Sequence, residues 1–109
     1  MNKFMMQQAQ KLQAQLLKAQ EELANVTVEA SSGGGAVTVV MTGHQRVQSI
    51  AVNQEALDLD DEEWLNDLQD LLVVAMNQAV EQSQMMAAEK MERITGGLGN
   101  IPGLGGLLG

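Results

Sequence analysis

Side chains able to carry out catalysis are sparse in this chain of 109 residues. There is one histidine, His44, and the sequence contains no cysteine and no tyrosine. A Ser–His dyad would have to use His44 as its base, and a Cys–His dyad is impossible because there is no cysteine. The segment Thr42-Gly43-His44-Gln45 has the composition of a turn. We interpret His44 as a turn residue, and we expect no enzymatic activity.

Two other patterns resemble ligand sites but do not meet their requirements. The run from Asp58 to Glu63 is acidic enough for a calcium loop, but it lacks the glycine that such a loop needs at its sixth position. The three glycines at 33–35 are not followed by the Gly-Lys-Ser/Thr of a phosphate-binding loop. We therefore expect no metal site, no cofactor and no small-molecule substrate.

The basic side chains are the best candidates for a binding function. Residues 1–20 contain three lysines and no acid, and two more cations stand near the end of the second predicted helix. Such side chains neutralise backbone phosphates, which positions a protein on nucleic acid without reading its sequence. The alternative is a solvated face beside an apolar seam. The candidate nucleic-acid contacts are Lys3, Lys11, Lys18, Lys90 and Arg93.

The net charge of −8 argues at first sight against a nucleic acid partner. The acidity is segregated, however. Eight of the fourteen acidic residues fall between Glu55 and Asp70, and no basic residue lies among them. DNA binding is compatible with this composition if the acidic segment points away from the DNA.

Three of these lysines lie in a predicted N-terminal helix. Residues 2–24 are good helix formers without glycine or proline, so we expect a long helix there. Apolar side chains in and just after it repeat with alternating spacings of four and three, the pattern of a coiled-coil seam. A lone seam cannot bury itself in water, so we expect a partner, and a homodimer is the simplest one. The seam consists of Met5, Ala9, Leu12, Leu16, Ala19, Leu23 and Val26.

The central segment predicts three short strands, at residues 26–30, 36–42 and 46–52. Each is rich in β-branched residues, and turn residues separate them at 31–35 and 42–45. We expect a three-stranded antiparallel meander, which is too small to be stable alone. One of its faces must therefore pack against helices.

A second long helix is expected from about Asp60 to Thr95. Asp60 is a suitable N-cap, Glu63 would complete a capping box, and Leu59 would pack on Trp64 as a hydrophobic staple. This arrangement would also place the acids at 61–63 in the first turn, where the helix dipole favours them.

The middle of this second helix, residues 71–76, is apolar on all sides, which predicts that it is covered from more than one direction. Farther along, the apolar stripe narrows, so we expect the helix to leave the body of the protein as an arm. The layout predicts the α+β class, with a single α-β-β-β-α domain at 1–95 and a Gly-rich flexible tail at 96–109. Because no signal peptide or membrane span is evident, we expect a cytoplasmic protein without a membrane partner.

The ordered set of elements resembles the YbaB/EbfC family of bacterial nucleoid-associated proteins. The resemblance covers about the first 95 residues. The stretches that carry it are Met6–Gln13, Ala19–Leu23, Ser32–Val37, Asp67–Val80, Glu89–Met91 and Thr95–Leu98.

The resemblance implies a tweezer-like homodimer with helical arms that binds duplex DNA with limited sequence preference. It also implies a location in the nucleoid, an effect on nucleoid organisation and gene expression, and no enzymatic activity. The chain departs from the family in having Thr38 where a basic residue is common, and Asn53-Gln54 where Asp-Pro is frequent. The alternative function is a helical clamp or chaperone-like protein-interaction module that does not bind DNA.

Overall fold

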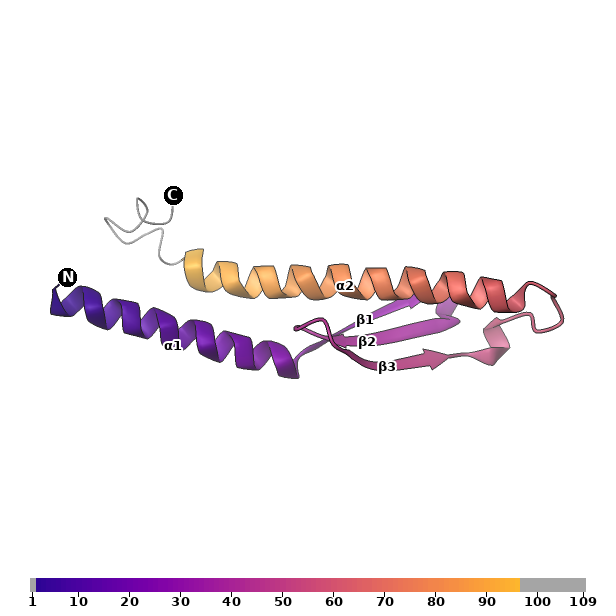
Figure 1. Ribbon diagram of the computed structural model, residues 1–109, viewed down its shortest axis with the longest axis horizontal. Helices are drawn as coiled ribbons and strands as arrows, with labels where there is room; N and C mark the ends of the chain where they lie inside the picture. Colours follow the sequence, from indigo (N-terminus) through magenta and orange to yellow (C-terminus); the bar gives the residue numbers. More distant parts are fainter. Residues whose placement is uncertain (1, 97–109) are drawn as a thin grey trace.

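The computed structural model describes residues 2–96, and its shape is elongated, with extents of 71 × 24 × 15 Å. A long helix, α1 (Lys3–Asn25), leads into a three-stranded sheet, and a longer helix, α2 (Trp64–Gly96), follows (Figure 1). α2 runs along most of the molecule. The sheet lies against its first half, and α1 lies beside its second half. The predicted α+β layout is confirmed.

Helix α1 begins and ends for local reasons. The side chain of Asn2 accepts a hydrogen bond of 2.8 Å from the amide of Met5, which satisfies one of the free N–H groups of the first turn. The helix ends at Asn25 because Val26 is extended, and the β-branched residues after it favour a strand. The predicted bounds, 2–24, differ by one residue at each end.

The sheet is the expected antiparallel meander. Its strands β1 (Thr27–Ser32), β2 (Val37–Thr42) and β3 (Val47–Val52) lie in the order β1-β2-β3. β1 continues two residues beyond its predicted end at Ala30, because the serines at 31 and 32 pair with β2. The serine hydroxyl at 32 also donates to the carbonyl of Leu71 over 2.7 Å, which fixes this end of β1 to α2.

A compact apolar core lies between α2 and only two of the three strands. α2 packs on β1 and β2, and β3 extends beyond it. The core consists of small and medium side chains, which allow the helix to approach the sheet closely. Its buried members are Ala30, Val37, Val39, Met41, Ala75 and Ala79.

The start of α2 differs from the sequence-based expectation. Residues 58–63 form turns, and the helix begins at Trp64. The carboxylate of Asp58 accepts from the amide of Asp60 over 3.2 Å, and that of Asp61 accepts from the amide of Glu63 over 2.9 Å. These local bonds compete with helix formation. The predictions of Asp60 as N-cap and of a capping box completed by Glu63 were therefore wrong.

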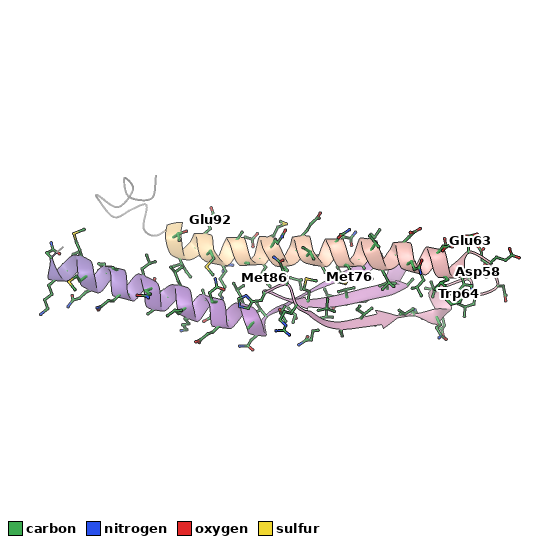
Figure 2. The ribbon with its side chains drawn as sticks, in the orientation of Figure 1. Asp58, Glu63, Trp64, Met76, Met86 and Glu92 are labelled. Atoms are coloured by element: carbon green, nitrogen blue, oxygen red, sulfur yellow. The ribbon has the colours of Figure 1, made fainter. Side chains whose placement is uncertain are left out.

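The predicted hydrophobic staple is not supported either. Leu59 lies in the turn segment and is 49% exposed, and Trp64 is the first residue of the helix and is 36% exposed. Figure 2 shows Asp58, Glu63 and Trp64 together at the end of the molecule that is farthest from α1. The acidic turns thus occupy one extremity of the protein.

The turn between β2 and β3 joins α1 to the body. The amide of Gly43 donates to the carbonyl of Leu23 over 2.9 Å and to that of Val26 over 3.1 Å. The imidazole Nε2 of His44 lies 2.6 Å from the carbonyl of Gln20 and donates to it. His44 is in the turn where the sequence placed it, and its contact is with the backbone of α1.

Helix α2 is tied to the same turn by Ser83. This buried side chain donates from its hydroxyl to the carbonyl of Thr42 over 2.8 Å. Beyond Ser83, α2 leaves the sheet and runs beside α1, as expected for an arm (Figure 1). Gly96 belongs to α2, and the rest of the predicted tail, 97–109, lies outside the described residues.

The apolar seam of α1 is only partly covered by this packing. Ala19 and Leu23 are buried, whereas Leu12 and Leu16 are half-buried. The remaining members, Met5, Ala9 and Val26, are exposed. One partner of the seam is therefore α2 of the same chain, along the half of α1 that is nearer to the sheet.

Candidate nucleic-acid interface

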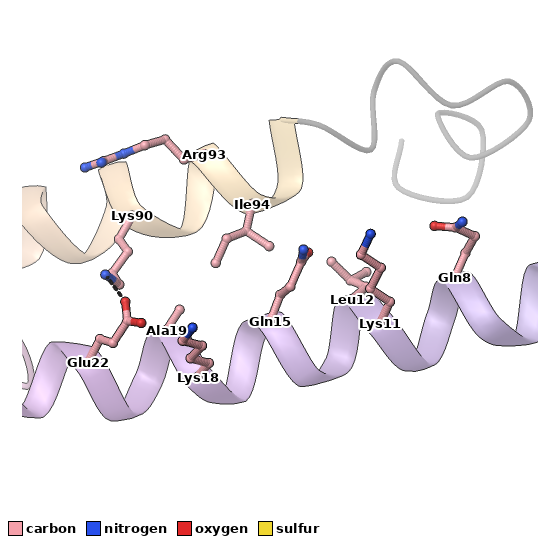
Figure 3. Close-up of a pocket in the computed structure, with 10 residues that line it drawn as sticks. All are labelled: Gln8, Lys11, Leu12, Gln15, Lys18, Ala19, Glu22, Lys90, Arg93 and Ile94. Atoms are coloured by element: carbon pink, nitrogen blue, oxygen red, sulfur yellow. Dashed lines mark ion pairs between the residues drawn. The ribbon is translucent and has the colours of Figure 1, made fainter.

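An open groove of about 570 Å³ lies between α1 and the last turns of α2 (Figure 3). α1 supplies one wall through residues spaced three and four apart, a spacing that puts side chains on one helical face. α2 supplies the other wall. The groove is lined by Gln8, Lys11, Leu12, Gln15, Lys18, Ala19, Glu22, Lys90, Arg93 and Ile94.

Four of the five cations proposed from the sequence meet in this groove. Lys11 and Lys18 come from α1, and Lys90 and Arg93 come from α2. Lys3, the first residue of α1, is not among the lining residues. The fold therefore brings together basic side chains from the two ends of the sequence.

Glu22 is the one charged residue of the groove lining that the sequence analysis did not single out. Its Oε2 atom lies 2.6 Å from Nζ of Lys90, so the two helices are linked across the groove (Figure 3). The hydrogen bond from Lys90 lowers the pKa of Glu22, and the positive charges of Lys90 and Lys18 lower it further. The sequence does contain one indication that Glu22 lies near the basic side chains. Glu22 follows Lys18 by four residues, so the two share one face of the helix.

The groove is suited to binding an anion. Its lining carries four cations against one carboxylate, so three positive charges remain in excess. Gln8 and Gln15 add amide groups that can donate hydrogen bonds, and Leu12 and Ile94 contribute apolar surface. The lining contains no serine, threonine, cysteine, histidine or tyrosine, and its one carboxylate, that of Glu22, is ion-paired.

The acidic segment lies far from the groove, as the segregation of charge suggested. It precedes α2 and occupies its first turns, whereas Lys90 and Arg93 stand in the last turns. A helix of 33 residues is about 50 Å long. At physiological salt the acidic charges at one end are therefore screened from the basic charges at the other. Nearer to the groove, Glu89 and Glu92 border a shallow hollow beside Arg93.

Two other classes of site have no counterpart within residues 2–96. No group of three or more acidic or histidine side chains is placed there to hold a metal ion. Neither described helix combines the length and apolar character needed to cross a lipid bilayer.

Comparison with known proteins identifies the family. The model of the YbaB/EbfC DNA-binding family matches residues 1–98. The chain belongs to the YbaB/EbfC DNA-binding family. This confirms the resemblance seen in the sequence, and the YbaB/EbfC family is a family of DNA-binding proteins, not of enzymes.

Several nucleoid-associated proteins are similar to this chain over most of their own length. A nucleoid-associated protein of Desulforamulus reducens is 55% identical over 104 residues, which cover 95% of this chain and 94% of that protein. A nucleoid-associated protein of Chloroflexus aurantiacus is 52% identical over 94 residues, covering 86% and 91%. The crystal structure of an uncharacterized Helicobacter pylori protein shares the fold, with a TM-score of 0.61, 17% identity, and coverage of 90% of this chain and 97% of that one.

Proposed function

We propose that this YbaB/EbfC family member is a nucleoid-associated protein that binds duplex DNA as a homodimer. It acts in the cytoplasm at the nucleoid, has limited sequence preference, and affects nucleoid organisation and gene expression. The observation that carries the proposal is the convergence of Lys11, Lys18, Lys90 and Arg93 in one groove. Lys3, outside the groove on α1, adds a peripheral phosphate contact.

The side chains of the groove favour contacts with the DNA backbone. Lysine and arginine neutralise phosphates, and these contacts are the same for every sequence. Binding to single strands usually needs aromatic side chains on which bases stack. The only aromatic residues are Phe4 and Trp64, and neither lines the groove. The groove is therefore better suited to a duplex backbone.

Uncovered apolar surface supports the homodimer. By strand register, Ile50 lies opposite Val39, and Val52 lies opposite Val37, so they share the face that α2 covers over β1 and β2. They are nevertheless 49% and 42% exposed, and Val73 of α2 is 59% exposed. Exposed apolar surface of this kind marks an interaction site. A second copy that covers β3 and one flank of α2 would bury it, and the dimer would present two grooves.

The salt dependence of binding gives a quantitative test. If about four phosphate contacts form together, log K falls with log salt at a slope of about −3.6, which is about a hundredfold between 50 and 200 mM salt. Fluorescence anisotropy of a labelled random-sequence 30-bp duplex measures this slope, with light scattering to establish the dimer. Weak salt dependence would contradict binding through phosphates.

Charge reversal then tests the groove. Lys11→Glu combined with Lys18→Glu should abolish DNA binding and leave the dimer intact. Arg46→Glu is the charge-matched control for the single change Lys11→Glu, because Arg46 is exposed and lies outside the groove. Equal losses in these two single variants would show that net charge, not the groove, governs binding. Loss of the dimer in the double variant would place the lysines in the interface.

The free end of α1 favours a second candidate function. Phe4, Met5 and Met6 are 63%, 43% and 51% exposed, and such flexible apolar side chains suit contact with a protein. The arms would then act as a helical clamp or chaperone-like module. An intact dimer that does not bind duplex DNA at 50 mM salt would support this function over the first.

A further inference from the structure

The ion pair across the groove involves one of the cations proposed to bind DNA. Within residues 2–96 it is the only salt bridge, and it joins Lys90 of α2 to Glu22 of α1 at 2.6 Å. The side chains are 27% and 45% exposed, so both are accessible from the groove. Figure 3 shows the pair at one end of the groove, with Lys18 beside it on α1.

A carboxylate on a lysine ammonium occupies the position that a phosphate oxygen would take. Both are anionic oxygens that accept a charge-assisted hydrogen bond. A phosphate that binds Lys90 must therefore displace Glu22 or share the ammonium with it. The retained carboxylate would then repel the phosphate, because like charges at close range are unfavourable. Glu22 also attracts Lys18, so its single negative charge acts on two of the four groove cations.

We propose that Glu22 is a built-in competitor for the phosphate site at Lys90, and that it limits the affinity of the groove for DNA. The inference rests on the proposed function, because it assigns a regulatory residue to the same groove. Neutralising Glu22 frees Lys90 and leaves the other cations in place. Binding should become tighter, and its dependence on salt should become steeper.

A purely structural role for the pair makes the opposite prediction. If the ion pair only held α1 and α2 at the correct separation, loss of either partner would misplace both walls and weaken binding. Glu22→Gln and Lys90→Gln would then have effects of the same sign. Competition predicts opposite signs, since the first change removes the competitor and the second removes the contact.

The experiment compares Glu22→Gln with Glu21→Gln in the full-length protein. Both variants lose one negative charge from adjacent positions on α1, but Glu21 is exposed and does not line the groove. Exposed ion pairs are weak, so we expect a gain of about two- to fivefold in DNA affinity per groove for Glu22→Gln. The salt slope should steepen by about 0.9 for each lysine that is freed. Equal affinities for the two variants, or weaker binding by Glu22→Gln, would overturn the proposal.

A Lys90→Gln background isolates the competitor. Adding Glu22→Gln to Lys90→Gln should change affinity no more than adding Glu21→Gln, because the Lys90 ammonium that pairs with Glu22 is absent. A full gain in this background would show that Glu22 acts by general repulsion and not through Lys90, which would contradict the proposal. Circular dichroism of each variant checks that the helices are retained.

Inorganic tripolyphosphate provides a readout that does not depend on DNA binding. Titration followed by the NMR signals of the lysine side chains should show tighter binding to Glu22→Gln than to Glu21→Gln. If the wild-type protein fails to bind duplex DNA, the proposed function fails, and this titration still decides the role of Glu22. Equal tripolyphosphate affinities in the two variants would overturn it.

Discussion

Gly43 lies directly against Leu23, and its amide donates a hydrogen bond of 2.9 Å to the Leu23 carbonyl. This contact joins the β2–β3 turn to the end of α1. Leu23 is buried, so its side of this contact is shielded from water. The direction in which α1 leaves the sheet, and hence the width of the groove, depends on this close approach.

Gly43→Ala should destabilise the fold. A Cβ atom at this position would lie 2.7 Å from the Leu23 carbonyl oxygen and 2.8 Å from its Cδ2. Because the nearest atom belongs to the backbone, the helix must move to relieve the clash. We expect a loss of about 1–3 kcal/mol in the free energy of unfolding, measured by urea denaturation. The matched control is Gly96→Ala, because nothing lies within 4 Å of a Cβ atom there. Equal stability of the two variants would contradict a tight junction.

Ser32→Ala should weaken the attachment of β1 to α2. The hydroxyl of Ser32 donates to the Leu71 carbonyl over 2.7 Å, and the residue is 8% exposed. Loss of such a bond costs about 1 kcal/mol in the free energy of unfolding. Ser49→Ala, on exposed β3, is the control and should have little effect. Denaturation that shows no difference between them would mean that the bond contributes nothing net.

The ion pair of Glu22 should stabilise the protein at neutral pH and not in acid. The folded-state pKa of Glu22 is held below its ordinary value of 4.5 by the hydrogen bond and charge of Lys90. Its contribution is therefore complete above pH 4.5 and is lost as the pH falls through the lower folded-state value. Glu22→Gln should melt below the wild type at pH 7, and the gap in melting temperature should narrow as the pH is lowered below 4.5. A gap that stays the same size in acid would show that charge is not the cause.

Ile50→Lys should convert the proposed dimer to a monomer. Ile50 is 49% exposed on the face of the sheet that α2 covers elsewhere, and a charge buried in an apolar interface is strongly unfavourable. Ala51→Lys adds the same charge on the opposite face of β3 and is the control. Light scattering should give the monomer mass for the first variant and the dimer mass for the second. The same mass for both variants would place the interface elsewhere.

The elements of this fold were predictable where their cause is local. Residues 2–24 have no helix breaker, and the three strands are rich in β-branched residues and separated by turns that contain glycine, so both patterns can be recognised within a few residues. The start of α2 was not predicted correctly. Asp60 and Glu63 match a capping box, but Asp58 and Asp61 accept local amide bonds that stabilise turns instead. Two local motifs compete there, and composition does not reveal which one wins.

By itself, the sequence determined the order of the elements, the family, and the position of Lys11 and Lys18 on one face of α1, because a spacing of seven residues is close to two helical turns. Only the tertiary structure decided that Lys90 and Arg93 meet those lysines, and that Glu22 pairs with Lys90. These residues are distant in the sequence. Their meeting depends on the angle between two helices, which is set by contacts at Gly43 and Ser83 and not by any local propensity.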